Sequence, residues 1–261
     1  MRTVAIIQAR LASSRLPGKV LYELAGLPII GFMAKRVQQI SELDELVLAT
    51  GEGERNDPLA DIAQGLGITV FRGSEDDVLS RFYGAAEANS ADIVIRLTGD
   101  CPLADASIIS DVLQYRAKYE LDYCTNVKPP SWPDGLDVSV FTMETLCRAA
   151  AEAQLPSERE HVVPWMWKMS SLENGSQLAA GNVSAPEDYS AARWTVDDAQ
   201  DYLMLRSLAA TMGPKTLLTA SWPEIMNCLS DHPEITAINA SAIRDAGLAQ
   251  SRLADYSLGE Q

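Results

Sequence analysis

The feature that most constrains the fold is a regular alternation of short apolar runs with segments of helical periodicity. Strand-like runs lie at Val4–Ile7, Glu45–Thr50, Ile68–Phe71, Asp92–Leu97 and Asp122–Val127. Helical segments lie between them, at about 28–40, 57–65, 76–88 and 106–119. The second of these begins with Asp57 as a predicted N-cap and Pro58 in the first turn. Strands that alternate with helices predict βαβ units and a mostly parallel sheet, and therefore an α/β fold.

The rhythm changes after Lys128, where a proline-rich loop, KPPSWPDG, begins. Beyond it the pattern predicts strands at 136–141 and 193–196 and helices at 142–153 and 158–169, and it leaves 177–184 undecided. Asp197 or Asp198 is expected to cap a long helix that ends at Met212. Short helices are expected at 222–229 and 233–244, within C-terminal helices over about 221–247, and the last dozen residues are expected to fray. We therefore expect one domain over residues 1–261, with an excursion at about 129–192 that supplies a lid or a dimer contact.

The charge of the chain excludes several kinds of partner. A formal net charge of −15 and a pI near 4.5 argue against nucleic acid or an anionic membrane, because both favour positive surfaces. No apolar run approaches the ~18 residues of a membrane span, and Met1 leads directly into the first strand without a signal peptide. The four widely spaced cysteines contain no CxxC pair, which favours reduced thiols in a cytoplasmic protein.

A cationic loop follows the first strand in spite of the acidic total charge. The first 22 residues hold Arg2, Arg10, Arg15 and Lys19 and no acid. In an open α/β sheet, ligands bind at the carboxyl ends of the strands, where these groups suit phosphate oxygens. The backbone at Ser13, Ser14 and Gly18 is expected to donate N–H groups to the same anion. The loop is not a P-loop, because Val20 follows Gly18-Lys19, and a solvated surface loop is the alternative.

Two acids are expected at the same edge of the sheet. Asp100, in TGDCPL, follows a strand, and Asp197, in RWTVDDAQDY, follows another predicted strand. Two carboxylates together with substrate phosphates suit Mg²⁺. Each acid also has a structural interpretation, Asp100 as a turn residue and Asp197 as a helix cap. Opposite the cationic loop, the pair predicts a metal–triphosphate site.

Three further residues are candidates for acceptor binding. His161, in EREHV, suits a general base or an acceptor ligand, or else a solvated histidine paired with Glu158. Asp134 and Asp137 lie within PDGLD, where an ordinary turn is the alternative. His232, before Pro233, is expected to be structural. Large apolar residues in the predicted excursion favour a homodimer, because exposed together they would exceed the patch a monomer tolerates; they are Trp132, Trp165, Met166 and Trp167.

The motifs together resemble a known family. Its series is QARLASSRLPGKVL, ELVLAT, VFRGSEDDVLSRFY, VIRLTGDCPLAD, WPDGLDVSVF, EREHV and RWTVDDAQDY. In this order, over about residues 3–205, they strongly resemble the spore-coat polysaccharide cytidylyltransferase-like proteins. Those proteins are related to the CMP-Kdo and CMP-sialic acid synthetases. The resemblance implies the nucleotide-diphospho-sugar transferase fold, a Rossmann-like three-layer α/β/α arrangement with a mixed sheet. Dimerisation of related synthetases through the equivalent excursion supports the homodimer.

The resemblance also implies roles for individual residues. Arg10, Arg15 and Lys19 would hold the triphosphate of CTP, and Asp100 and Asp197 would bind Mg²⁺. The base and ribose would lie near the strand ends and the next loop, at Gln8, Ala9, Thr50, Arg72 and Asp77. An acceptor hydroxyl would attack the α-phosphorus in line, and pyrophosphate would leave with stabilisation from Lys19.

The match has two departures. Gln8 stands where the sugar-acid synthetases usually have proline, and the spore-coat branch shares this glutamine. Ser139 stands where relatives commonly have glutamate. The identity of the acceptor therefore stays open. A metal-dependent glycosyltransferase is a second hypothesis, although TGDCP has one Asp in place of an Asp-x-Asp pair. A non-catalytic nucleotide-binding protein is a third. Pyrophosphate release separates the three.

Overall fold

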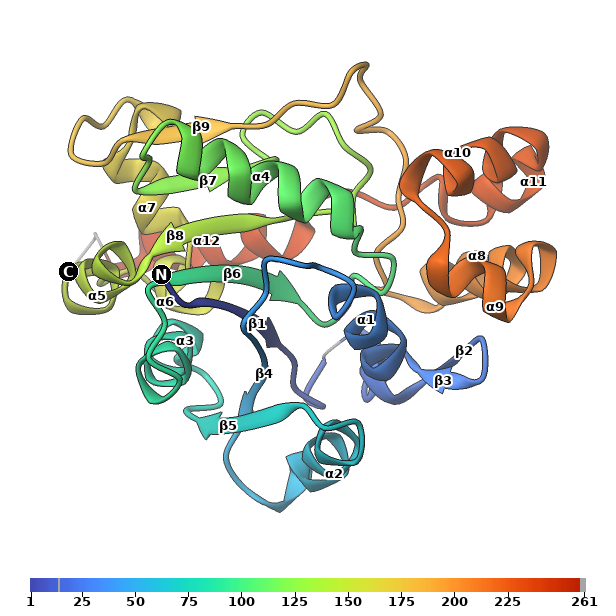
Figure 1. Cartoon of the computed structure of the whole chain (residues 1–261), viewed down its shortest axis with the longest axis horizontal. Coiled ribbons are helices and arrows are strands. Elements are labelled where there is room, and N and C mark those ends of the chain that lie inside the picture. The colour runs from blue at the N-terminus through green and yellow to red at the C-terminus, as the bar shows by residue number, and fades with distance from the viewer. Residues whose placement is uncertain (14, 259–261) are drawn as a thin grey trace.

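The computed structural model describes residues 1–13 and 15–258 and contains a seven-stranded sheet (Figure 1). The strand order is β5-β4-β1-β6-β8-β7-β9. The strands are β1 (Thr3–Gln8), β4 (Glu45–Gly51), β5 (Thr69–Gly73), β6 (Ile93–Thr98), β7 (Tyr123–Thr125), β8 (Ser139–Thr142) and β9 (Ala180–Asn182). A two-stranded ribbon, β2 (Glu23–Leu24) with β3 (Leu27–Pro28), stands apart from this sheet.

β1 lies in the interior of the sheet, between β4 and β6, which fits its wholly apolar run from Val4 to Ile7, with all four residues fully buried. It pairs in parallel with β4 on one side and β6 on the other, and β5 pairs in parallel with β4. β8 runs antiparallel to both β6 and β7. The prediction of a mostly parallel, mixed α/β sheet is confirmed.

Helices cover both faces of the sheet (Figure 1). Apolar residues of α1 (Ile29–Val37), α2 (Asp57–Gly65) and α4 (Ala106–Lys118) pack on one face, and those of α3 (Val78–Ala88), α5 (Met143–Glu152) and α7 (Pro164–Met169) pack on the other. The short helix α6 (Pro156–His161) lies against α3 on this second face. The remaining helices are α8 (Ala199–Met212), α9 (Pro214–Thr219), α10 (Trp222–Asp231), α11 (Pro233–Thr236) and α12 (Ala246–Leu258), of which α12 packs against α6. Alternate residues of the strands supply the two cores, as a pleated sheet requires.

Several predicted elements differ in the structure. The single helix expected over 158–169 is two helices, α6 and α7, because Val162 has φ +71° and Pro164 begins a new turn. The strand expected at 193–196 is wrong. Arg193 forms only an isolated bridge with Asp134, and the Val196 amide donates to the Asp100 carbonyl. Asn56, and not Asp57, is the N-cap of α2.

The predicted excursion at 129–192 does not leave the sheet, because it supplies β8 and β9. Its large apolar residues are buried within the chain: Trp132 is 4% exposed, Trp165 1%, Met166 0% and Trp167 7%. The exposed patch that favoured a homodimer therefore does not exist at these residues. The C-terminal end also differs from the expectation of fraying, since α12 extends to Leu258, while residues 259–261 lie outside the described residues. No helix of the described chain is long and apolar enough to cross a membrane.

Candidate active site

The site lies where β1 and β6 end side by side. The Gly99 amide donates to the Gln8 carbonyl at 2.8 Å, so the two strands remain paired up to their last residues. A Cβ atom at Gly99 would lie 2.8 Å from the Cβ of Ala9, a contact too short for any other residue. This close approach brings the loop after β1 next to Asp100. Ser14, one of the expected amide donors, lies outside the described residues.

Lys19 is the point at which the cationic loop meets the acids. Gly18, at φ +70°, turns the loop into a short 3₁₀ helix at Lys19–Leu21. The Lys19 Nζ lies 2.9 Å from Asp100 Oδ2 and 2.9 Å from Asp197 Oδ1, and it donates to the Val196 carbonyl at 2.6 Å. Its side chain is only 11% exposed. The ammonium therefore directs all three of its protons to fixed oxygen atoms.

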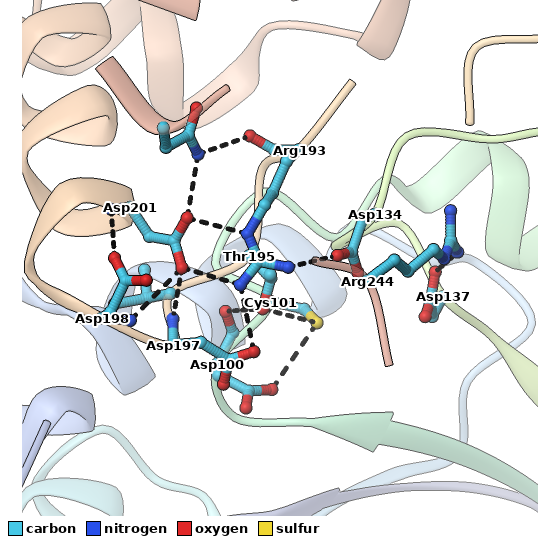
Figure 2. A network of polar contacts seen from close by, with 12 residues as sticks. Asp100, Cys101, Asp134, Asp137, Arg193, Thr195, Asp197, Asp198, Asp201 and Arg244 are labelled. Carbon is cyan, nitrogen blue, oxygen red and sulfur yellow. Dashed lines mark hydrogen bonds and ion pairs between the residues drawn. The ribbon is translucent and has the colours of Figure 1, made fainter. Parts of the chain in front are cut away.

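Two arginines complete this cluster. Arg15 Nη2 lies 2.8 Å from Asp197 Oδ1, as expected of a residue in the cationic loop. Arg193 lies between three acids, Asp134, Asp197 and Asp201, with N–O distances of 2.5, 3.1 and 2.8 Å (Figure 2). These contacts hold the segment between Arg193 and α8 against the loop that carries Asp134.

The electrostatics of Asp100 and Lys19 are coupled. Burial alone raises the pKa of Asp100, but the Lys19 ammonium and hydrogen bonds to the carboxylate outweigh burial and lower this pKa to about 2. Burial likewise lowers the pKa of Lys19, and the charges of Asp100 and Asp197 raise it above its ordinary value. Both groups are therefore ionised at neutral pH.

The other residues predicted to bind nucleotide are distributed unevenly. Arg10 turns toward the other face of the sheet, where it donates to the Glu75 carbonyl at 3.0 Å and lies 3.5 Å from Glu160. Ala9, which is buried, follows β1 directly. Gln8 Oε1 and Thr50 Oγ1 are buried, and no described residue hydrogen-bonds to either, so both can accept a ligand's contact.

Arg72 and Asp77 are not brought to this cluster. Arg72 Nη2 pairs with Asp57 Oδ1 at 2.6 Å. Asp77 is the N-cap of α3, where it accepts the Ser80 amide, and it pairs with Arg159. Both side chains have structural partners, which weakens the case for contacts with ribose or base.

The predicted acceptor residues also have partners within the chain. Asp134 pairs with Arg193, and Asp137 accepts from Arg244 at 2.7 Å (Figure 2). Burial raises the pKa of Asp137 to about 7 against the opposing charge of Arg244. His161 Nε2 lies 2.9 Å from Ser251 Oγ of α12, and burial lowers the pKa of this imidazole.

A magnesium ion fits this donor set only together with a ligand that supplies more oxygen atoms. Within residues 1–13 and 15–258, no three His, Cys, Asp or Glu side chains form a group that could hold a metal ion. Asp100 and Asp197 nevertheless direct oxygens at one point, since both lie 2.9 Å from the same Nζ. Two carboxylates plus substrate phosphates suit Mg²⁺.

Sequence reasoning did not assign Arg193, Asp201 and Arg244 to the site. Arg193 and Asp201 lie within RWTVDDAQDY, four residues on either side of Asp197, so the motif itself carried the signal. The helical spacing from Asp197 to Asp201 brings the Asp201 carboxylate to the Asp197 amide at 2.9 Å. Arg244 lies far outside every motif, and nothing in the sequence indicated its contact with Asp137.

Comparisons with known proteins identify several similar chains. A family model described as cytidylyltransferase matches residues 4–169. The chain is 32% identical over 235 residues to the spore coat polysaccharide biosynthesis protein SpsF of Bacillus subtilis, covering 88% of this chain and 94% of that protein. It is 30% identical over 204 residues to the 3-deoxy-manno-octulosonate cytidylyltransferase of Anaeromyxobacter dehalogenans, covering 72% and 82%. The solved structure of a cytidylyltransferase from Leptospira borgpetersenii superimposes with a TM-score of 0.83 at 30% identity, covering 90% of this chain and 97% of that one.

Proposed function

Because the chain belongs to the cytidylyltransferase family, we propose that it transfers CMP from CTP to a sugar or sugar-like acid and releases pyrophosphate. The name of the Bacillus subtilis relative supports a role in the biosynthesis of a surface polysaccharide. The observation that carries the proposal is the convergence of Lys19, Asp100 and Asp197 at the ends of β1 and β6.

The protein's own contribution is to position charge. Arg15 and Lys19 carry positive charge to the point where a triphosphate would lie, and each pairs with Asp197. Phosphoryl and nucleotidyl transfer need little covalent chemistry from the protein, so fixed cations that neutralise the developing charge supply most of the catalysis. Lys19 stabilises the leaving pyrophosphate, and its burial keeps competing water away.

Magnesium is proposed as the cofactor, with Asp100 and Asp197 as its protein ligands. When bound, it would lower the pKa of the attacking hydroxyl and neutralise phosphate charge. Lys19 pairs with the same two carboxylates. A chelator such as EDTA is expected to abolish turnover, and added MgCl₂ to restore it.

Release of pyrophosphate from each of the four nucleoside triphosphates, with and without a panel of sugars, tests the activity. We expect release with CTP and an acceptor, and little with ATP. A glycosyltransferase would instead release a nucleotide from a ready-made nucleotide sugar, and a non-catalytic binder would stabilise with CTP without any turnover. Equal thermal stabilisation by ATP and CTP would contradict the assignment of the base.

Three further properties remain predictions. A cytoplasmic location is supported by four free cysteines, two of them buried, which suit a reducing compartment. Nucleic acid is not expected as a partner, because the net charge is −15. The homodimer is no longer supported by the tryptophans, because they are buried within one chain. The mass measured by light scattering at micromolar concentration tests it.

A further inference from the structure

Asp201 is a fully buried carboxylate that accepts hydrogen bonds from four residues (Figure 2). It lies in the first turn of α8, where its Oδ2 accepts the amides of Asp197 at 2.9 Å and Asp198 at 3.2 Å. Its Oδ1 accepts the Asn239 side chain at 2.9 Å. Arg193 donates to both oxygens, at 2.8 Å each. A carboxylate has about four lone-pair sites, so these donors use its whole accepting capacity and fix its position.

Capping of α8 does not by itself require this arrangement. Asp198 and Asp201 form a capping box, in which the Asp201 carboxylate need only accept the Asp198 amide. The bonds from Asn239 and Arg193 come from outside the helix. Asn239 ends a short 3₁₀ helix, Ala237–Asn239, and also donates to the Arg193 carbonyl at 3.2 Å. The contacts beyond the capping box therefore fix Arg193 through both its main chain and its side chain.

Arg193 in turn holds one oxygen of the Asp197 carboxylate. Arg193 Nη2 donates to Asp197 Oδ2 at 3.1 Å. The other oxygen, Oδ1, is the one that lies 2.9 Å from Lys19 Nζ and 2.8 Å from Arg15 Nη2. The Asp201 carboxylate fixes the Asp197 amide at the same time. Main chain and carboxylate are thus both held, with Oδ2 toward Arg193 and Oδ1 toward the cationic loop.

The same guanidinium joins this acid to the loop before β8. Arg193 Nη1 donates to Asp134 Oδ2 at 2.5 Å, and the Trp194 amide donates to the Asp134 carbonyl at 2.6 Å. The Arg193 side chain is 8% exposed. A guanidinium has five donors in a rigid, planar fork, whereas a lysine ammonium is a compact point charge on a flexible stem. The contacts with three carboxylates at once therefore depend on arginine and not on positive charge alone.

We propose that Arg193 is a positioning residue that presents a single oxygen of Asp197, Oδ1, to the magnesium ion. Asp201 and Asn239 support it in this role. The proposal rests on the proposed function, because it takes Asp197 as a magnesium ligand. Carboxylates that ligate metal ions are themselves held by hydrogen bonds, and loss of such a partner lowers metal affinity or activity about ten- to a hundredfold.

The test uses Arg193→Lys and Asp201→Asn. The first variant keeps the positive charge and loses the fork, and the second keeps the shape of the side chain and loses one of its two accepting oxygens. Asp105→Asn is the matched control, because Asp105 is a buried carboxylate that caps α4 and accepts the Trp222 amide at 2.8 Å. Urea denaturation establishes that each variant is folded at the temperature of the measurement.

The readout is the affinity for α,β-methylene-CTP, an analogue that cannot release pyrophosphate, measured by calorimetry in EDTA and in MgCl₂. Binding in EDTA should be similar in all four proteins, because Arg15 and Lys19 are retained. The gain in affinity with Mg²⁺ should fall about tenfold or more in Arg193→Lys and in Asp201→Asn, and it should persist in Asp105→Asn. Turnover with CTP and a panel of sugars is measured separately.

Each outcome separates the proposal from the proposed function. A full Mg²⁺ gain in either Arg193→Lys or Asp201→Asn would overturn the proposal and leave Arg193 with a structural role. An equal loss in Asp105→Asn would overturn it as well, because any weakened helix terminus would then have the same effect. Absence of a Mg²⁺ gain in the wild type would refute Asp197 as a magnesium ligand, and this proposal with it. Absence of turnover alongside an intact Mg²⁺ gain would refute the proposed reaction alone.

Discussion

Lys19 shows how a single side chain organises the candidate site. Its ammonium joins Asp100, which follows β6, to Asp197, which precedes α8, and so connects two segments that are distant in the sequence. Removing one partner leaves the others as buried, uncompensated charges. The same three residues therefore carry both local stability and the proposed chemistry.

The first prediction concerns Asp100→Asn. The substitution removes a negative charge and a proposed metal ligand but little volume, so the chain should fold, and CMP transfer should fall by about a hundredfold or more. Pyrophosphate release at saturating CTP measures this loss. Asp188→Asn, in an exposed loop, is the matched control and should leave the rate unchanged. Wild-type turnover in Asp100→Asn would show instead that Asp100 is only a turn residue with a structural role.

The second prediction follows from the depressed pKa of the same carboxyl group. Its folded pKa is about 2, against an ordinary value of 3.8. The ionised form therefore stabilises the fold above about pH 4, and this stabilisation, roughly 2 kcal/mol, is lost as pH falls toward 2. Urea titrations between pH 5 and 2 should show the wild type losing more of its free energy of unfolding than Asp100→Asn. Parallel curves would contradict this assignment.

The residue scale also shows which contacts the sequence could predict. Arg15, Lys19 and Asp100 are brought together as expected, because β1 and β6 end side by side at one edge of the sheet. Asp197 joins them although no strand precedes it, since the Val196 amide donates to the Asp100 carbonyl and the Asp197 carboxylate pairs with Lys19. Arg72 and Asp77 are not brought to this cluster, because salt bridges with Asp57 and Arg159 hold them. Pairing between exposed loops depends on rotamers and loop paths, which periodicity does not encode.

At the scale of elements, polar contacts from Ser251 and Asp255 help to hold α12 against α6. Ser157 of α6 donates its amide to Asp255 at 3.0 Å, and Ser251 lies 2.9 Å from His161. Leu248 packs on the core, whereas Leu253 is 70% exposed. Within 246–255, the part of α12 whose side chains the structure describes, little apolar surface is buried, and such a segment opens locally at low free-energy cost.

The third prediction is that Asp255→Ala loosens α12 without unfolding the sheet. The variant loses two hydrogen bonds to Ser157 at the start of α6. Hydrogen exchange over 246–256 should accelerate about five- to thirtyfold, while β1 and β6 stay protected. Arg252→Met, which removes only an exposed pair with Glu173, should change exchange little. Unchanged exchange in Asp255→Ala would show that apolar contacts hold the helix.

The elements themselves were predicted unevenly. β1, β4, β6, α3 and α4 were predicted from apolar runs and caps, because their periodicity is strong and local. The segment 193–196 was misassigned as a strand because its alternation of apolar and polar residues matches a strand. Its Trp194 and Val196 are buried in the core, but within the described residues the segment forms only the isolated bridge between Arg193 and Asp134. Tertiary context outweighed the pattern there.

At the scale of the whole molecule, the tryptophans of α7 are part of the core. Trp165 is 1% exposed, and Trp167, at 7%, donates its indole N–H to the Tyr123 hydroxyl at 2.8 Å. They join α7 to β7 and to the helices on that face of the sheet. Apolar residues that look excessive for a loop are ordinary once β8 and β9 extend the sheet beneath them.

The last prediction concerns what happens when this core is opened. If Trp165 and Trp167 formed a dimer surface, polar replacements would give a soluble, folded monomer. Because both are buried within one chain, Trp165→Ser should instead cost about 3–5 kcal/mol, and any change in assembly should follow unfolding. Urea denaturation measures the stability, and light scattering on the same sample measures the mass. Trp165→Phe keeps most of the buried volume and should lose much less, so it serves as the matched control. A folded Trp165→Ser monomer with wild-type stability, derived from a wild-type dimer, would restore the interface at this surface.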